Sequence, residues 1–459
     1  MSASSKANYK PKAIDIERIG LYNYKSVFLD LDQYTTVFRI YEDIFTNTMT
    51  CSLQILDAVS LIETFPIIGE ELIEIEFSTP TFDENIRCLF DVYKISDREK
   101  QGDKADSYTL FGVSREHIRS MNRTVDRAYT GYAIGDIVKL VYNNVLKDKQ
   151  KGKEIEIEPT LGLHSFIAPE NAPFEFINLL SSEAQSATNR QLSNYVFYED
   201  HDQFNFKTIA GMFDQEPVED FYYIQQDVEE EVTLDEGDKI SPDQRVESIE
   251  YLNQFDMLSQ TDNGLLDNSS LILDLIFKET EERTFIYDKD FSKLKSLGGN
   301  KIISSVNSAV DSVGASHSRY FLSNLSLGNY HQKSYLNRRC PPIDPTNFYP
   351  FVRHKFVAST IAHSASINNI MMHISVPGNS KIKAGQIINL YVPTNASDQE
   401  TKDTYNKFFG NKYSSAKFLV VRVEHVYNKA AGYFTIMKVA KDAYAEPALT
   451  ELDDQGVPR

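Results

Sequence analysis

The sequence predicts a mainly β protein with α+β inserts, in which one β-domain, a meander that closes as a barrel or a sandwich, occurs twice. Two observations predict this fold. Runs of alternating apolar and polar residues follow one another over short links in the first quarter of the chain. A similar set returns near the C-terminus, where Gly69 followed by 72–77 is matched by Gly385 followed by 387–392. One β-unit used twice is the simplest explanation.

The resemblance between the two ends extends over three successive elements. The run 89–95 in the first set corresponds in character to 420–426 in the second, and 108–110 corresponds to 434–436. A duplicated β-domain has a consequence for assembly, because a ring of such chains contains twice as many units as subunits.

The first β-barrel domain is predicted over residues 13–122, after a flexible N-terminus at 1–12. Apolar residues alternate with polar ones in each of its strands, which gives one buried and one solvent-exposed face. Glu74 and Glu76 are expected on the exposed face. The alternating apolar positions are Met49, Cys51, Leu53 and Ile55, then Ile73, Ile75 and Phe77, then Cys88, Phe90 and Val92.

Residues 123–213 predict an α+β insert. Apolar residues at helical spacing indicate a helix over 134–146, and a second helix is expected to begin at Pro173, because proline favours the first helical position. Two strands, 194–198 and 204–207, form a hairpin. His201 lies in the connecting turn between two aspartates, and we expect this turn to be pH-sensitive or exposed to solvent.

An acidic linker is predicted at 214–245, since residues 214–238 contain no Lys or Arg. The alternative is an acidic surface that docks a partner or lines a lumen. The second β-barrel domain is predicted over 246–277 and 350–445.

Within this second domain, 270–276 resembles 50–57 of the first. A short helix is expected within 354–367 and a strand over 370–376. Residues 278–349 form an inserted irregular domain, rich in Ser, Asn and Gly. A polar acidic tail follows at 446–459.

Composition excludes several classes of protein. The chain has 459 residues, 41% of them hydrophobic, which is typical of a globular protein of about three domains. No stretch approaches the ~20 apolar residues of a membrane span, and the first dozen residues lack a secretory leader. The formal net charge of −19 disfavours tight binding to nucleic acid.

The sequence offers no recognisable catalytic or metal site. It contains no GxSxG, HExxH, GxxxxGK[ST] or strand-linked GxGxxG motif. His354, His363 and His373 are spaced nine and ten residues apart, which fits no single-element metal site. Cys51 and Cys88 are expected as buried free thiols, and Cys340 stands apart from both. We therefore predict no catalytic, cofactor-binding or metal-ligating residue and no cofactor.

The order of these elements resembles the baseplate hub protein of contractile-tailed bacteriophages of the T-even type, and more distantly the hub half of the VgrG spike of type VI secretion. The resemblance covers roughly residues 12–445. It rests on domain order, from the first β-domain through the insert with 174–180 and 195–198 to the second β-domain with 384–390 and 420–426. The long 278–349 excursion and the acidic run after 214 depart from shorter members of the family.

This resemblance implies a structural, non-enzymatic protein of the virion, assembled in the host cytoplasm. It implies a homotrimer in which the two tube-like β-barrel domains of each chain form a ring of pseudo-sixfold symmetry, which adapts the sixfold tail tube to the threefold central spike. Tail-tube or tube-initiator protein, spike protein and the surrounding wedge proteins are the implied partners. The acidic charge suits a conduit through which genomic DNA passes without binding.

Three alternatives remain. The chain could be a hub or spike component of a tailocin or secretion machine, which genome neighbourhood would distinguish. It could be a cell-wall hydrolase that uses scattered carboxylates, which zymography would reveal. A β-rich adhesin is the third, and the absence of a leader disfavours it.

Overall fold

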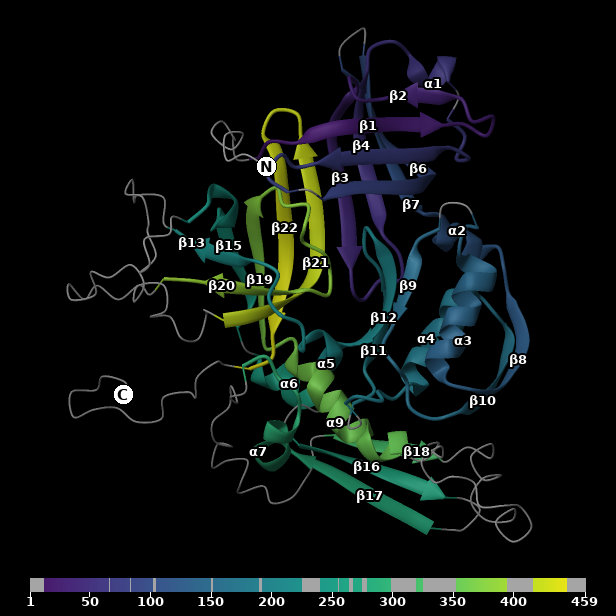
Figure 1. The fold of residues 1–459 in the computed structure, drawn as a ribbon, viewed down its shortest axis with the longest axis vertical. Coiled ribbons are helices and arrows are strands. Elements are labelled where there is room, and N and C mark those ends of the chain that lie inside the picture. The colour runs from purple at the N-terminus through teal and green to yellow at the C-terminus, as the bar shows by residue number, and fades with distance from the viewer. Residues whose placement is uncertain are drawn as a thin grey trace, which may run out of the picture.

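The computed structural model describes residues 12–65, 67–82, 84–101, 105–149, 152–189, 192–224, 240–254, 256–263, 267–274, 279–298, 319–324, 352–393 and 416–443 (Figure 1). Its main feature is a mixed sheet of 14 strands. The predicted tail 446–459, the N-terminal 1–11 and Cys340 lie outside the described residues.

The N-terminal part of the sheet is antiparallel, with strand order β3-β4-β7-β6-β5-β1-β2. Short helices α1 (Leu61–Thr64) and α2 (Arg115–Met121) flank it. Its strands are β1 (Asp15–Tyr22), β2 (Phe28–Asp30), β3 (Thr35–Asp43), β4 (Thr50–Asp57), β5 (Leu72–Ser78), β6 (Asn85–Gln101) and β7 (Ala105–Ser114). Every apolar residue predicted to face inward in β4, β5 and the first half of β6 is buried, including the two free thiols.

The C-terminal part of the sheet runs β15-β19-β22-β21-β20-β13-β14. A second apolar core packs under it, separate from the first. Its strands are β13 (Asp220–Tyr223), β14 (Arg245–Val246), β15 (Ser248–Asn253), β19 (Ile370–Pro377), β20 (Ile387–Tyr391), β21 (Ala416–Asn428) and β22 (Gly432–Lys441).

Strand pairing reveals the same five-stranded unit in both parts. The order β3-β4-β7-β6-β5 in the first corresponds to β15-β19-β22-β21-β20 in the second, with every pair antiparallel. Gly69 and Gly385, which precede β5 and β20, both have positive φ values, 94° and 87°. The predicted repetition of three successive strand elements is therefore present in the strand topology.

The pairing also corrects the register of the repeat. The N–H of Val92 bonds the Glu71 carbonyl at 2.9 Å, and the N–H of Val420 bonds the Gln386 carbonyl at 2.8 Å. A β-bulge follows each residue, at Tyr93 and at Val421. Val92 is thus equivalent to Val420, whereas the sequence comparison placed Leu89 there, three residues earlier.

The two units join edge to edge. β21 beyond its bulge pairs antiparallel with β3, from Arg422 opposite Asp43 to Asn428 opposite Val37. Figure 1 shows β21 and β22 beside β3 and β4 at this junction. The predicted mainly β fold is confirmed, but the described residues form no closed barrel, because the strands of both units belong to one mixed sheet.

The α+β insert matches its prediction closely. The expected first helix is α3 (Ile134–Val141) continued by a π-helical turn η2 (Tyr142–Leu146), and the second is α4 (Pro173–Glu183), with proline in its first turn. The predicted hairpin is β11 (Tyr195–Glu199) and β12 (Gln203–Thr208). The insert also contains β8 (Val125–Tyr132), β9 (Glu154–Ile157), β10 (His164–Asn171) and α5 (Ile209–Met212).

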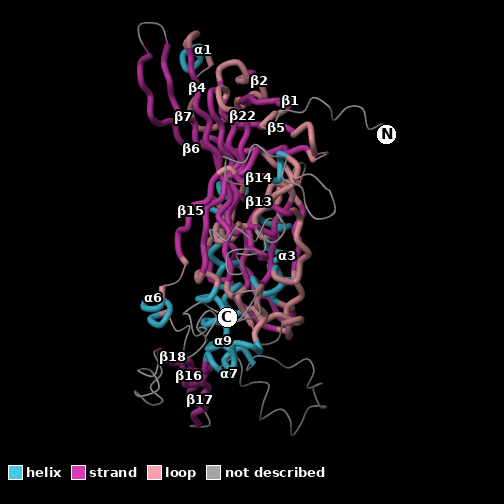
Figure 2. Tube along the Cα trace, turned by 90° about the vertical axis from the view of Figure 1, so that its left-hand side faces the viewer, coloured by secondary structure: helices cyan, strands magenta, loops and turns pink. Residues whose placement is uncertain are grey.

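A small sheet lies at the far end of the molecule from β1 and β4 (Figure 2). It has the order β17-β16-β18 and packs against helix α9 (Val352–Ser366), the helix expected within 354–367. Its strands are β16 (Asp267–Asp274), β17 (Glu279–Ile286) and β18 (Arg319–Asn324), accompanied by α6 (Met257–Asp262), α7 (Tyr287–Asp290) and η4 (Phe291–Lys293).

This small sheet overturns one predicted equivalence. β16, which contains most of 270–276, pairs with β17 and β18 and has no partner in the large sheet among the described residues. The counterpart of β4 in the second unit is β19. The similarity between 270–276 and 50–57 reflects strand composition alone.

The segment predicted as an acidic linker is partly strand. β13 pairs in parallel with β20 inside the large sheet, and the 3₁₀ turn η3 (Pro242–Gln244) leads into β14. Residues 225–239 lie outside the described residues. No helix in the described part of the chain is long and apolar enough to span a bilayer.

Candidate functional site

Glu42 lies at the point where the two units and the insert meet. Its side chain is fully buried on β3. Oε1 accepts N–H bonds from the backbone of His201, at 3.0 Å, and from His201 Nδ1, at 2.7 Å, while Oε2 accepts the Ala384 N–H at 3.0 Å. Burial alone would raise the pKa of Glu42, but His201, His425 and the Ala384 N–H reverse this effect and lower the pKa to about 2.

His425 brings the second unit into the same cluster. It is fully buried on β21, and its ring meets that of His201 edge-on with centroids 5.9 Å apart. Nδ1 lies 2.8 Å from the Tyr433 hydroxyl, and Nε2 has no hydrogen-bond partner among the described residues. Burial lowers the pKa of His425 to about 4, so the ring is neutral at neutral pH.

Glu42, His201 and His425 each offer one ligand atom, and these atoms lie within 4.8 Å of one another. Carboxylate and imidazole are ligands that Zn²⁺ uses. Both oxygens of Glu42, however, already accept N–H bonds from the protein. The cluster is therefore arranged as a polar clasp that binds three parts of the chain together.

The prediction that His201 lies in a solvent-exposed turn is wrong. The turn between β11 and β12 is buried against the junction, and His201 is 6% exposed. Asp200 accepts the N–H groups of Asp202 and Gln203, which shapes the turn, while Asp202 pairs with Lys383. No local signal predicts the cluster, because its members come from three distant segments.

A second, partly buried ion pair holds the insert against the residue that precedes β4. Lys153 Nζ lies 2.7 Å from Glu199 Oε1 and also donates to the Asp200 carbonyl. Glu199 Oε2 accepts the N–H of Met49 at 2.9 Å. Burial would lower the pKa of Lys153, and the carboxylate of Glu199 more than offsets this, so the ammonium stays charged.

Carboxylates gather in a pocket of about 400 Å³ beside this ion pair. Burial and the nearby Glu199 raise the pKa of Glu116 to about 7. A carboxyl group with a raised pKa next to a second, ionised carboxylate is the pattern that glycoside hydrolases use. Here the second carboxylate, Glu199, is committed to Lys153 and to the Met49 N–H, which gives the group a structural role.

Glu74 differs from its prediction, and His363 and His373 lie in separate elements. Glu74 is 1% exposed, although its place in β5 suggested the solvent side, because Tyr22 donates to it at 2.8 Å and Arg87 at 2.6 Å. His363 is buried in α9, where Asn194 and the Lys295 carbonyl flank its two ring nitrogens. His373 lies on β19 beside Glu250.

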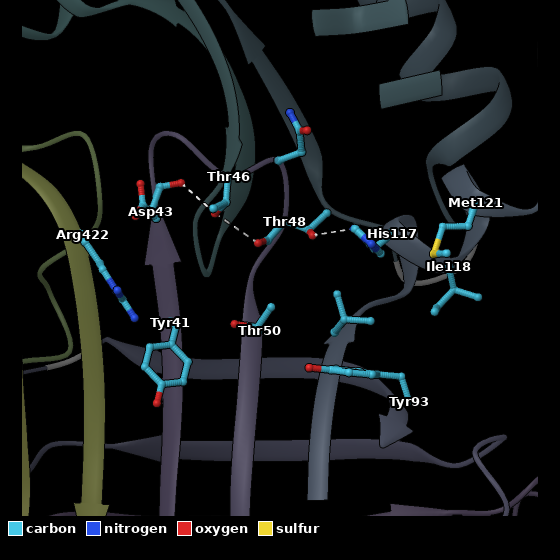
Figure 3. Close-up of a pocket in the computed structure, with 12 residues that line it drawn as sticks. Tyr41, Asp43, Thr46, Thr48, Thr50, Tyr93, His117, Ile118, Met121 and Arg422 are labelled. Carbon is cyan, nitrogen blue, oxygen red and sulfur yellow. Dashed lines mark hydrogen bonds between the residues drawn. The ribbon is translucent and has the colours of Figure 1, made fainter. Parts of the chain in front are cut away.

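A larger pocket, of about 690 Å³, opens beside the junction of the units. Figure 3 shows Arg422 and Asp43 on one side of it and Ile118 and Met121 of α2 on the other. His117 Nδ1 lies 3.3 Å from the Thr48 hydroxyl. Met121 and Tyr93 are 73% and 54% exposed.

Comparison with known proteins places the fold. No protein-family model matches the sequence, and no curated protein matches it. Solved structures do match. A tail protein from Neisseria meningitidis MC58 shares 9% identity, with 93% of this chain and 96% of that chain covered and a TM-score of 0.54. The 43 kDa tail protein of prophage MuSo2 from Shewanella oneidensis shares 9% identity, with 93% and 99% covered and a TM-score of 0.51.

A type VI secretion component of E. coli, described as structurally similar to the T4 tail proteins gp27 and gp5, matches at a TM-score of only 0.41 and 10% identity, over 96% of this chain and 80% of that chain. The two tail proteins confirm the predicted resemblance to phage tail proteins as a likeness of fold that covers nearly the whole chain.

Proposed function

We propose that this chain is the baseplate hub protein of a contractile phage tail, a trimeric adaptor between the sixfold tail tube and the threefold central spike. The observation that carries this proposal is the five-stranded unit that occurs twice in one chain. Three copies would supply six similar units, which is the number that a sixfold tube presents.

The way in which the two units join supports this role. A tube needs neighbouring units in continuous contact around its circumference. The β3–β21 pairing and the Glu42 clasp hold the two units edge to edge in one chain, so each subunit brings two adjacent sixths of the ring already assembled. The tail-protein fold agrees with such a place in a virion.

The charge of the chain suits a DNA conduit. At −19, the protein repels phosphate, so DNA would pass without adhering to the wall. The buried clusters among the described residues bind parts of the chain to one another, which supports a structural role. Tube protein above, spike protein below and wedge proteins around are the proposed partners.

A hub in a tailocin or secretion machine is the second candidate. The same architecture would serve there, because those machines also join a sixfold tube to a threefold spike. Genes for a capsid next to this gene would favour the phage.

Light scattering coupled to size exclusion tests the proposal. The purified chain, alone or co-expressed with the spike protein encoded beside it, is expected to have the mass of three copies in at least one of the two preparations. A monomer in both would contradict the adaptor role.

A further inference from the structure

The junction inside the chain provides a template for contacts between chains. β21 has two partners on one side: β20 before its bulge at Val421 and β3 after it. The bulge therefore marks the point at which β21 stops pairing with β20 of its own unit and begins to pair with β3 of the first unit. β3, in turn, contributes to this junction the edge that faces away from β4.

Among the described strands, the equivalent edges at the other end of each unit have no such partner. β6 corresponds to β21: it pairs with β5 before its bulge at Tyr93, but from Lys94 to Gln101 it pairs only with β7 among the described strands. β15 corresponds to β3 and pairs only with β19 in the described part of the chain.

The second half of β6 and strand β15 are more exposed to solvent than their counterparts β21 and β3. Residues 97–101 of β6 and most residues of β15 are exposed. Leu252 of β15 and Tyr93 at the bulge are 41% and 54% exposed, respectively. Exposed strand edges of this kind are templates for pairing with another chain.

We propose that the β6 edge of one copy pairs antiparallel with the β15 edge of a second copy, in the manner in which β21 pairs with β3. The occupant is a second copy of this chain, because the template joins one such unit to another. This inference rests on the proposed hub function and specifies the strand edges that close its ring.

The equivalence sets the register of the proposed contact. Glu424 lies opposite Tyr41 in the template. The first paired residue after the bulge is Arg422 in β21 and Lys94 in β6. Glu424 and Ser96 each follow that residue by two positions, so they are counterparts. The counterpart of Tyr41 is Asn253, through the matched pairs of β4 and β19. Ser96 of one copy therefore faces Asn253 of the next.

Such a contact is heterologous, because two different edges meet, and each copy presents one of each. Heterologous contacts form a closed ring when the rotation between copies closes. In one chain, six strands separate β6 from β15 along the path β15-β19-β22-β21-β3-β4-β7-β6. A bond between the two edges therefore links different copies.

Disulfide trapping tests the pairing. Opposite residues in antiparallel strands have Cα atoms about 4.5–5.5 Å apart, within the reach of a disulfide. The full-length chain with Cys340→Ser receives Ser96→Cys, Asn253→Cys or both, and is oxidised with copper phenanthroline. Ser96→Cys combined with Ser165→Cys, a position exposed on β10, is the matched control.

The expected products follow from heterologous pairing. The double variant gives dimers and trimers on non-reducing gels, with no larger closed species, and an equimolar mixture of the two single variants gives dimers alone. Each single variant and the control pair stay monomeric on the gel.

Three results would overturn the inference: no cross-link in the double variant, dimers of one single variant by itself, or equal cross-linking of the control pair. Light scattering of the uncross-linked protein separates the two proposals. A trimer that does not cross-link overturns the strand pairing and leaves the hub role standing, whereas a monomer that does not cross-link, with or without the spike, overturns both.

Discussion

Glu42 links the two units and the insert through hydrogen bonds of its carboxylate. Its carboxylate accepts N–H bonds from His201 in the insert and from Ala384 just before β20, and it lies beside His425 of β21. A buried carboxylate is costly unless it is fully bonded, and removing one member of such a cluster leaves the others desolvated without a partner.

Glu42→Gln is therefore expected to lower the free energy of unfolding by about 3 kcal/mol, since an amide has only one acceptor oxygen for the three N–H donors and places its NH₂ group against one of them. Urea denaturation measures the loss. The matched control is Glu424→Gln, which removes a partly exposed pair with Arg39 and should cost less than about 1 kcal/mol. Equal losses for the two variants would contradict the importance of the clasp.

His425 gives the fold a dependence on pH. Burial lowers its pKa in the folded protein to about 4, from 6.5. Between these values the unfolded chain binds a proton that the folded chain does not. The stability that neutral His425 contributes is therefore complete above pH 6.5 and is lost as the pH falls towards 4, by up to about 1.4 kcal/mol per pH unit.

The groups that face His425 are Glu42, His201 and Tyr433. Glu42, with a pKa of about 2, stays ionised throughout this window. Urea midpoints between pH 7.5 and 4.5 are expected to fall less steeply for His425→Gln than for the natural chain. His363, whose pKa is also about 4, remains in both proteins. Parallel curves would show that His425 does not carry the effect.

At the scale of elements, the two glycines that open β5 and β20 have different surroundings. Both have positive φ, which costs a residue with a Cβ atom about 1 kcal/mol. The space at Gly69 is open, whereas a Cβ at Gly385 would overlap the hydroxyl of Tyr198 in the insert.

Gly385→Ala is therefore expected to lower the melting temperature more than Gly69→Ala does. Adding Tyr198→Phe to Gly385→Ala removes the overlapping hydroxyl and should recover part of the difference. Differential scanning fluorimetry measures the melting temperatures of the natural chain, the two glycine variants and the double variant. The interpretation fails if both glycine variants melt together or if Tyr198→Phe brings no recovery.

Alternation along single strands made much of this architecture predictable. Buried positions such as Leu53, Ile75 and Phe90 follow from a period of two, and the helix starting at Pro173 follows from its first residue. Alternation carries no information about bulges, so the sequence comparison aligns the repeat three residues out of register at β6. It also does not identify pairing partners, so 270–276 is predicted in the second β-domain although β16 belongs to the small sheet.

The clasp illustrates the same limit at the site. Glu42, His201 and His425 are ordinary polar residues in their own segments, and only the joining of β3 to β21 brings them together. Aspartates on both sides of His201 indicated an exposed turn, but the hairpin that carries it inserts into the junction. A contact that depends on tertiary pairing of distant strands leaves no local pattern in the sequence.

The whole molecule combines two equivalent units with parts that occur once. The insert with α3 and α4 and the small β17-β16-β18 sheet each have no second copy among the described elements (Figure 1). A ring of three chains would therefore show sixfold order where the five-stranded units lie and threefold order where the single parts project.

Negative-stain electron microscopy of the assembled protein, alone or with its spike, tests this arrangement in views down the ring axis. Averages are expected to show six inner lobes of similar size and three larger outer features. The inner order follows from the duplicated unit, and the outer order follows from the insert and the small sheet. Three inner lobes would mean that the two units of a chain do not stand side by side around the axis. Six equal outer features would require a hexamer, in which the duplication has no adaptor role.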